Sequence, residues 1–341
     1  MNVNPYTEYF GTNPQFLHSE QPFALESGYV LPSLRICYHT YGTLSPSRDN
    51  VIWICHALTA NSDVADWWQG TVVGGGVFDP AKYFVVCANK LGSCYGSTSP
   101  VDWQQPMDFP LVTIRDMVGA HQLLAQALGV EQIKLLIGGS TGGAQAMEWA
   151  IMEPERFGNL ALTVTLPKCT PWITADNEAQ RMALRADKTL YNNQAHGGGD
   201  GLMAARAFSM LIYRNAVAFN FTQRDDAEKL TDFRAASYQR YQGEKLSKRF
   251  DARSYYKMLD ALDTHDVGRG RGGVGAALAR IKARTVVMSV DTDIMFPAAD
   301  VELFAGQIPG AIYHCIHSDF GHDGFLIETA QLAQILREHL L

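Results

Sequence analysis

Residues 133–151 read Ile133-Lys-Leu-Leu-Ile-Gly-Gly-Ser-Thr-Gly-Gly-Ala-Gln-Ala-Met-Glu-Trp-Ala-Ile151. The apolar run at the start predicts a buried strand. After the glycines, apolar residues recur at three- and four-residue steps, as they do on one face of a helix. Ser140 therefore lies where a strand turns sharply into a helix. The five residues 138–142 fit G-x-S-x-G, the pattern of a nucleophile elbow.

The glycines of this stretch have a physical reason. A serine at so tight a corner is held in strained backbone geometry, and Gly138 and Gly142 lack side chains, so the strand and the helix can approach closely. The corner leaves the Thr141 amide at a helix N-terminus, free to donate to a developing negative charge. The alternative is a glycine-rich turn whose serine only caps the helix. The strand before and the helix after favour a catalytic Ser140.

Composition excludes several classes of partner. The chain has 341 residues and a net charge of −7, without a long basic run, which argues against nucleic acid or an anionic membrane as a partner. It shows no signal-peptide pattern and no apolar run of membrane-spanning length. No C-x-x-C pair occurs, so neither a zinc site nor a disulfide framework is expected. We expect a cytoplasmic protein with reduced cysteines and no metal.

The order of predicted elements indicates the fold class. Strand-like runs at 51–55, 83–87, 133–137 and 160–165 alternate with helical patterns, including a helix from Thr113, its N-cap, to Leu128. This order predicts a mostly parallel sheet covered on both faces. Residues 34–41 alternate like a strand of an antiparallel pair at the sheet edge.

The character of the chain changes after the fourth strand. Helical patterns at 204–217, 249–262 and 274–281 are separated by polar loops, among them an exposed loop at 196–201. We therefore expect a helical lid at 168–283 over the site, inserted into a core formed by 1–167 and 284–341. Strand character returns at 285–290, and a helix from about 326 to 340 closes the chain.

Two further stretches have competing interpretations. Residues 268–273 satisfy G-x-G-x-x-G, but no strand precedes them, so a dinucleotide site is rejected. A flexible hinge is preferred there, and contact with a phosphate-bearing substrate is the minor alternative. The loop after strand 51–55 should supply the second oxyanion amide. We assign it to Leu58, with Ala57 as the neighbouring possibility, and we expect His56 to hydrogen-bond locally.

A nucleophilic serine requires a base and a group that orients the base. Asp291 and Asp293 both follow the last strand-like run, at the strand ends where sites in parallel sheets gather. His322 lies in a glycine-flanked loop farther along, whereas His314 and His317 belong to an extended segment and are interpreted as structural. Ser140 and His322 are thus two members of a triad. The residues alone leave Asp291 and Asp293 nearly equal as the third.

Several stretches together resemble the homoserine O-acetyltransferase family, whose members have the α/β-hydrolase fold. The matching residues run from the first third of the chain to its end, at 56–68, 91–97, 138–149, 177–181, 249–255, 264–273, 293–297 and 321–325. The resemblance implies Asp293 as the triad aspartate, because the family places it before an x-x-Phe-Pro turn. One departure is Thr141, since the members that this chain resembles usually have Met there, which leaves the acyl preference open.

The resemblance also implies how substrates bind. It implies substrate contacts from Arg206, Tyr213 and Asp323. An arginine is suited to the carboxylate of homoserine, and an aspartate can neutralise its ammonium group. From the residues alone, a surface residue of an amphipathic helix is the preferred interpretation of Arg206, and a capping residue of a loop is an equally acceptable interpretation of Asp323. The implied reaction is acetyl transfer from acetyl-CoA to L-homoserine by a ping-pong mechanism, a step toward methionine, in a homodimer without a cofactor.

The sequence is compatible with several alternative activities. Succinyl-CoA could replace acetyl-CoA, or serine could replace homoserine, on the same scaffold. An esterase or thioesterase would use the same three residues with water as the acceptor. A binding protein with an inactive site is a further alternative, against which the intact set of Ser140, Asp293 and His322 argues.

Overall fold

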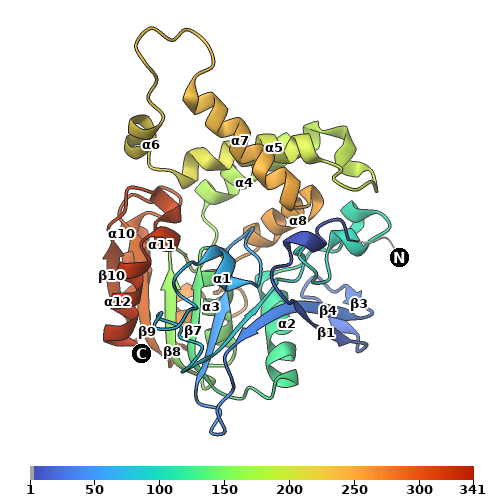
Figure 1. The fold of residues 1–341 in the computed structure, drawn as a ribbon. Coiled ribbons are helices and arrows are strands. Elements are labelled where there is room, and N and C mark those ends of the chain that lie inside the picture. The colour runs from blue at the N-terminus through green and yellow to red at the C-terminus, as the bar shows by residue number, and fades with distance from the viewer. Residues whose placement is uncertain (1–3) are drawn as a thin grey trace.

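An eight-stranded sheet forms the centre of the computed structural model, which describes residues 4–341 (Figure 1). The strand order is β1-β4-β6-β5-β7-β8-β9-β10. From β6 to β10 all neighbours are parallel, and β4 pairs antiparallel with both β1 and β6. This confirms the predicted mostly parallel α/β architecture. The strands are β1 (Gln15–Ser19), β4 (Leu34–Tyr41), β5 (Val51–Cys55), β6 (Phe84–Ala88), β7 (Ile133–Gly139), β8 (Phe157–Thr163), β9 (Arg284–Val290) and β10 (Ile312–Ile316), and a separate ribbon joins β2 (Phe23–Ala24) to β3 (Val30–Leu31).

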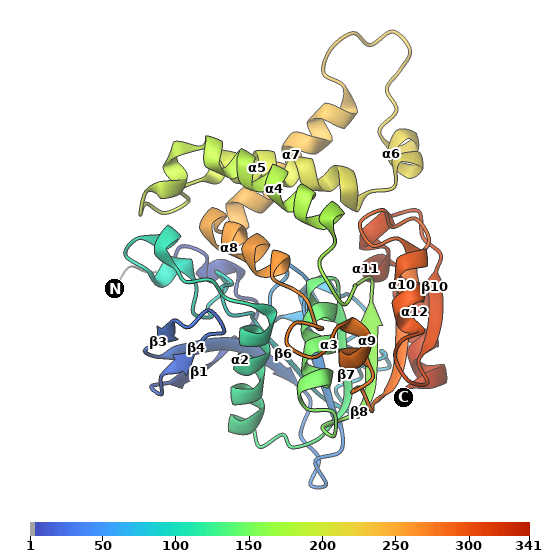
Figure 2. The ribbon, with the colours of Figure 1, turned by 180° about the vertical axis from the view of Figure 1, so that it is seen from behind.

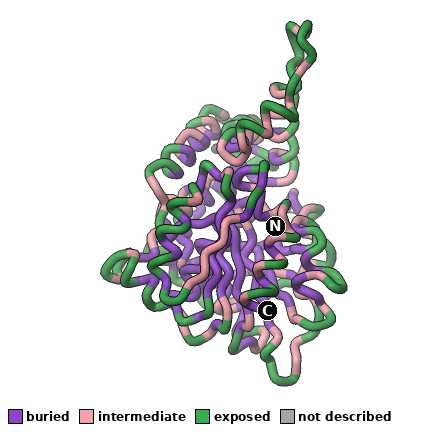
Figure 3. Tube along the Cα trace, turned by 90° about the vertical axis from the view of Figure 1, so that its left-hand side faces the viewer, coloured by how far each residue is buried: buried purple, intermediate pink, exposed green. Residues whose placement is uncertain are grey.

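Both faces of the sheet are buried, and the side chains of β5 contribute to the cores on both faces. Trp53 packs into the core on one face, whereas Ile52 and Ile54 pack into the core on the other, because successive side chains of a strand point to opposite faces. The burial view in Figure 3 shows the strands enclosed and the outer loops exposed. The first face is covered by α2 (Ile114–Ala127), α3 (Thr141–Met152), α9 (Val274–Leu278) and α10 (Ala298–Ala305), and the second by α1 (Val64–Trp67), α11 (Gly324–Ile327) and α12 (Thr329–His339).

Helix α2 begins where the sequence predicts. The Thr113 side chain accepts a hydrogen bond from the Asp116 amide, and the Asp116 carboxylate accepts one from the Thr113 amide. This capping box satisfies two amides that the first turn leaves without helical partners. Gly129 follows the helix with φ of 66°, a conformation that glycine adopts without steric cost.

A layer of helices lies over the carboxyl ends of the strands, between β8 and β9 in the sequence (Figures 1 and 2). It consists of α4 (Pro171–Ala186), α5 (Gly199–Tyr213), α6 (Ala216–Thr222), α7 (Arg234–Arg249) and α8 (Ala252–Asp263). Its apolar side chains form a core with residues of the central domain, such as Leu58 and Tyr95. Helix α9 does not belong to this layer. Its residues Ala277 and Leu278 pack into the core on the sheet face that α2 and α3 cover.

The helical boundaries in this layer differ from the prediction. The predicted helix 204–217 is two helices, because the chain turns extended at Arg214 and the Asn215 side chain then caps α6. Helix α5 also begins at Gly199, inside the stretch predicted to be an exposed loop. The predicted helix at 249–262 starts at Ala252, since Arg249 ends α7, a helix that the apolar pattern did not reveal.

The glycine-rich stretch 268–273 is anchored on both sides, which contradicts the flexible hinge. Arg271 pairs with the buried carboxylate of Glu148 on α3. Arg269 pairs with Glu26 at 2.8 Å. Both arginines are thus engaged in protein contacts, so the minor alternative of a phosphate contact has no support either. Among residues 4–341, no helix is long and apolar enough to span a bilayer.

Candidate active site

Ser140 occupies the corner between β7 and α3 in the strained conformation that its sequence predicts. Its φ is 56° and its ψ is −124°, a region that residues with a side chain rarely adopt. The glycines around it permit this corner. A Cβ on Gly142 would lie 2.0 Å from the Cys55 carbonyl oxygen, and one on Gly138 would lie 2.2 Å from the Gly142 carbonyl oxygen. The corner therefore depends on these two glycines.

The structure brings Ser140, His322 and Asp293 together. His322 Nε2 lies 2.9 Å from Ser140 Oγ, and His322 Nδ1 lies 2.8 Å from Asp293 Oδ2. All three side chains are buried. The other oxygen of Asp293 accepts the amides of Met295 and Phe296 at 2.8 and 3.0 Å, so the carboxylate is fixed from both sides. This is the geometry of a serine, its base and the group that orients the base.

Electrostatics favour the protonated form of His322. Burial lowers its pKa, but the charge of Asp293 and the hydrogen bond to it outweigh burial, and the pKa is raised above the ordinary value. An imidazole in this setting can accept the serine proton and hold it as a charged ring. By contrast, Asp291 pairs at the surface with His317 at 2.9 Å, away from Ser140. His56 is buried and contacts the neighbouring Ala57 carbonyl oxygen at 2.8 Å, in agreement with the local role expected for it.

His322 is also held by the helical layer. Its ring lies 5.4 Å from the Tyr213 ring and 5.2 Å from the Phe296 ring. Gly321, the preceding residue, has φ of 63°, and a Cβ there would lie 2.6 Å from the Tyr213 carbonyl oxygen. The end of α5 therefore packs directly on the His322 loop.

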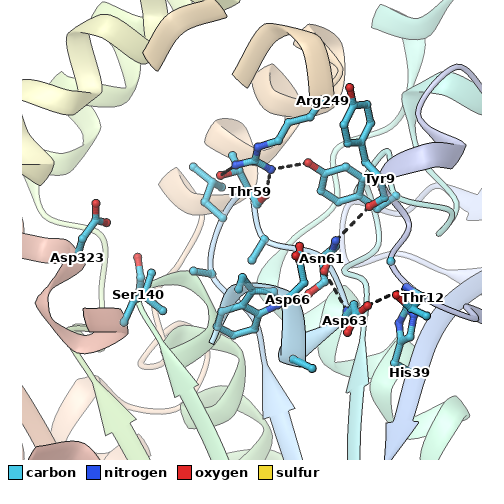
Figure 4. Close-up of a pocket in the computed structure, with 18 of the residues that line it drawn as sticks. Tyr9, Thr12, His39, Thr59, Asn61, Asp63, Asp66, Ser140, Arg249 and Asp323 are labelled. Atoms are coloured by element: carbon cyan, nitrogen blue, oxygen red, sulfur yellow. Dashed lines mark hydrogen bonds between the residues drawn. The ribbon is translucent and has the colours of Figure 1, made fainter. Parts of the chain in front are cut away.

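A cleft of about 1460 Å³ opens beside Ser140. Figure 4 shows Ser140 and Asp323 at one end of it, while Arg249, Thr59 and Tyr9 lie farther along. The predicted substrate residues Arg206, Tyr213 and Asp323 all line this cleft. Leu58 and Thr141, the predicted oxyanion residues, are buried beside Ser140, and Leu58 lines the cleft as well.

The cleft holds charges of both signs. The Arg206 guanidinium carbon lies 5.1 Å from the centre of the Tyr213 ring, and no carboxylate of residues 4–341 is found within ion-pair distance of this arginine. Asp323 is paired with Arg214, whose Nη1 lies 3.3 Å from its Oδ2. Arg214 is not among the site residues predicted from the sequence, although it directly follows Tyr213.

A second, smaller pocket of about 30 Å³ also borders Ser140. Its walls are mainly apolar and include Leu58, Leu166, Met295 and Phe296. The two spaces meet at Ser140, which lines both of them.

Comparison with known proteins agrees with this geometry. Residues 50–329 match the family model of the alpha/beta hydrolase fold. Homoserine O-acetyltransferase of Cyclobacterium marinum is 42% identical over 334 residues, which cover 96% of this chain and 95% of that protein.

Solved structures with the same fold include two different activities. Homoserine O-acetyltransferase of Staphylococcus aureus superposes with a TM-score of 0.81 at 28% identity, covering 96% of this chain and 94% of that chain. An acetylester hydrolase of Corynebacterium glutamicum gives a TM-score of 0.88 at 25% identity, covering 100% and 99%. The curated relative is far more similar in sequence than either. The chain therefore belongs to the homoserine O-acetyltransferase family within the alpha/beta hydrolase fold.

Proposed function

We propose that this protein transfers an acetyl group from acetyl-CoA to the hydroxyl of L-homoserine through an acyl-enzyme on Ser140. The observation that carries the proposal is the hydrogen-bonded chain Ser140–His322–Asp293 at the meeting point of two pockets, in a chain of this family. No metal or cofactor takes part in the proposed steps.

In the first half-reaction, His322 removes the Ser140 proton and the serine oxygen attacks the thioester carbon. The oxyanion receives hydrogen bonds from the amides of Thr141 and Leu58. The intermediate collapses, the carbon–sulfur bond breaks, and His322 returns its proton to the leaving thiolate of CoA. Asp293 orients the imidazole and stabilises its charged form.

In the second half-reaction, homoserine replaces CoA in the cleft. The unpaired guanidinium of Arg206 is suited to its carboxylate as a two-pronged donor. Asp323 is suited to its ammonium group, and Arg214 holds that aspartate in place. His322 then removes the proton of the homoserine hydroxyl, whose oxygen attacks the acetyl carbon. The bond between that carbon and the Ser140 oxygen breaks, and His322 returns the proton to Ser140.

The smaller pocket favours acetyl over succinyl. A volume of about 30 Å³ suits a methyl group, and a succinyl group would add a carboxylate. The ammonium group at the rim, that of Lys168, is already paired with Asp266 at 3.1 Å. Burial lowers the pKa of the neighbouring His265, so this ring stays neutral and offers no positive charge. The side chains that line the pocket therefore offer no free positive charge to a succinyl carboxylate, and burying that carboxylate among them is costly.

The helical lid contributes to the proposed reaction. Helices α4–α8 cover the carboxyl ends of the strands and contribute Arg206 and Tyr213 to the cleft. We assign α9 to the core domain and not to the lid, because its buried residues pack on the sheet face that α2 and α3 cover. Limiting water at the acyl-enzyme is the role that we give this layer, since a transferase must protect its intermediate from hydrolysis.

A homodimer and a cytoplasmic location are also proposed. Helices α5 and α6 expose large apolar side chains, including Leu211, Val217 and Phe221, and a second copy of the chain would cover them. Light scattering should give twice the chain mass for the wild type, and Phe221→Asp should lower it to one. The six cysteines form no disulfide, as suits a reducing compartment.

The test is thiol release from acetyl-CoA and from succinyl-CoA, each with and without L-homoserine. We expect sustained release only with acetyl-CoA and homoserine together. The same dependence on homoserine with succinyl-CoA would keep the mechanism and change the donor. Equal rates with and without homoserine would make water the acceptor and refute the transferase.

A further inference from the structure

Lys90 is a buried cation beside the nucleophile that the mechanism above does not use. Its side chain is 2% exposed and comes from the loop after β6. All oxygens around its ammonium group are neutral: the carbonyl oxygens of Ala57 at 2.8 Å, Leu58 at 3.1 Å and His56 at 3.5 Å, and the hydroxyl of Thr141 at 3.3 Å.

A charge in this position is expensive to bury. Carbonyl and hydroxyl dipoles compensate an ammonium group only in part, and an apolar side chain of similar volume usually stabilises a fold more than a buried charge does. Lys90 is therefore poorly explained as a stabilising residue. Its contacts suggest another reason, because two of its partners belong to Leu58 and Thr141, the residues assigned to the oxyanion hole.

The geometry of one peptide connects Lys90 to that hole. The Ala57 carbonyl and the Leu58 amide belong to the same planar trans peptide, so they point in opposite directions. Lys90 donates to the carbonyl side, as its Nζ lies 2.8 Å from the Ala57 oxygen. The Leu58 N–H on the opposite side is thereby fixed in direction, and the nearby positive charge polarises the peptide so that this N–H becomes a stronger donor.

The second oxyanion residue is tied to the same ammonium group. Lys90 donates to the Thr141 hydroxyl, which links the loop after β5 to the first turn of α3. Gln145, one turn along α3, donates to the Thr141 carbonyl oxygen at 3.1 Å. Thr141 is therefore held at both its side chain and its backbone.

We propose that Lys90 is a positioning residue of the oxyanion hole, whose ammonium group aligns the Leu58 and Thr141 amides and gains a nearby anion only when the tetrahedral intermediate forms. This role of Lys90 rests on the proposed function, because it concerns the oxyanion formed during acyl transfer to Ser140. A buried cation that meets its counter-charge only in the transition state lowers the barrier without tightening substrate binding.

The pH dependence follows from the surroundings of Lys90. Burial lowers the pKa of its ammonium group from the ordinary value to about 7. The titratable groups that face it are all neutral near that pH, because burial raises the pKa of the two thiols and lowers that of the two imidazoles: Cys55, Cys87, His56 and His121. The contribution of Lys90 should therefore be present below pH 7 and fade above it.

The test compares Lys90→Met with the wild type in the acetylation of Ser140 by p-nitrophenyl acetate, followed by the burst of p-nitrophenol. This reaction uses the oxyanion hole whatever the natural acceptor is, so it separates the role of Lys90 from the choice of homoserine. We expect the burst rate to fall 10- to 100-fold at pH 6.5, with the KM for homoserine in the full reaction within about twofold. Lys134→Met, at the opposite end of β7 from Ser140, is the matched control and should react like the wild type.

Two further readouts exclude a merely structural role. The ratio of wild-type to Lys90→Met burst rates should shrink between pH 6.5 and pH 9, and the titration of His322 cancels in this ratio. The Tm of Lys90→Met at pH 6.5 should equal or exceed that of the wild type. A ratio near one at every pH, or a ratio that is independent of pH and accompanied by a lower Tm, would overturn the proposal. If Lys90→Met does not fold, Lys90→Gln, which is neutral but keeps a donor for the Ala57 carbonyl, is measured in its place.

Discussion

Replacing Asp293 by Asn should reverse the direction of the hydrogen bond between residue 293 and His322 Nδ1 while leaving the fold intact. Asp293 Oδ1 accepts two backbone amides, those of Met295 and Phe296. An amide NH₂ cannot accept, so the side-chain oxygen of Asn must take this position. Its NH₂ group then faces His322 Nδ1, which must become the acceptor. The proton of the neutral ring moves to Nε2, the nitrogen that should accept the proton of Ser140.

The expected fall in kcat follows from the loss of a competent base. Replacing a triad aspartate by asparagine in another serine enzyme lowers kcat about 10⁴-fold through the wrong tautomer, which corresponds to about 5.4 kcal/mol at 1.36 kcal/mol per decade. We expect Asp293→Asn to show a loss of this size in both CoA release and the p-nitrophenyl acetate burst. Its two backbone contacts survive, so the unfolding midpoint in urea should stay close to that of the wild type.

Asp291→Asn is the matched control for this prediction. Asp291 also follows β9 and also pairs with a histidine, His317, but this pair lies at the surface, where exposed ion pairs contribute little. Its kcat should stay within about twofold of the wild type. The reasoning is refuted if Asp293→Asn keeps more than a tenth of wild-type kcat while folded, or if Asp291→Asn loses as much activity.

Three other outcomes follow from the structure. Gly142→Ala should lower the unfolding free energy by about 1–3 kcal/mol or more in urea titrations, because its Cβ would lie 2.0 Å from the Cys55 carbonyl oxygen. Gly74→Ala, with no atom within 4 Å of the new Cβ, should change it far less. Arg206→Met should raise the KM for homoserine roughly 10- to 100-fold through the loss of a charged hydrogen bond, with the Ser140 acetylation rate unchanged. The Lys90 pKa is lower in the folded than in the unfolded chain, so the unfolded chain binds the extra proton above pH 7. Urea midpoints should therefore show wild-type stability rising relative to Lys90→Met from pH 7 toward pH 10.

Contacts between residues close in the sequence determine much of the proposed site, and the sequence alone therefore predicts them. The glycines around Ser140 predict the elbow because only residues without side chains permit such a corner, and the structure shows that a Cβ added at Gly138 or Gly142 would collide with backbone. The cap of α2 at Thr113 is likewise a contact within one turn. The glycine-flanked loop indicates His322, whereas the choice of Asp293 over Asp291 rests on the family resemblance.

The remaining features depend on contacts between distant segments. Apolar residues resume at Ala216 and Val217 after Arg214 and Asn215, so the sequence predicts a single helix over 204–217. Nothing in the sequence indicates that Arg214 pairs with Asp323, 109 positions farther along by their numbers. The sequence likewise did not reveal that Lys90 reaches under Leu58 and Thr141. Turns and caps are set by neighbours in the chain, and their signals are therefore visible in the sequence. The partner of a buried charge is decided only when the sheet and its helices pack, because that packing excludes water and selects which dipoles replace it.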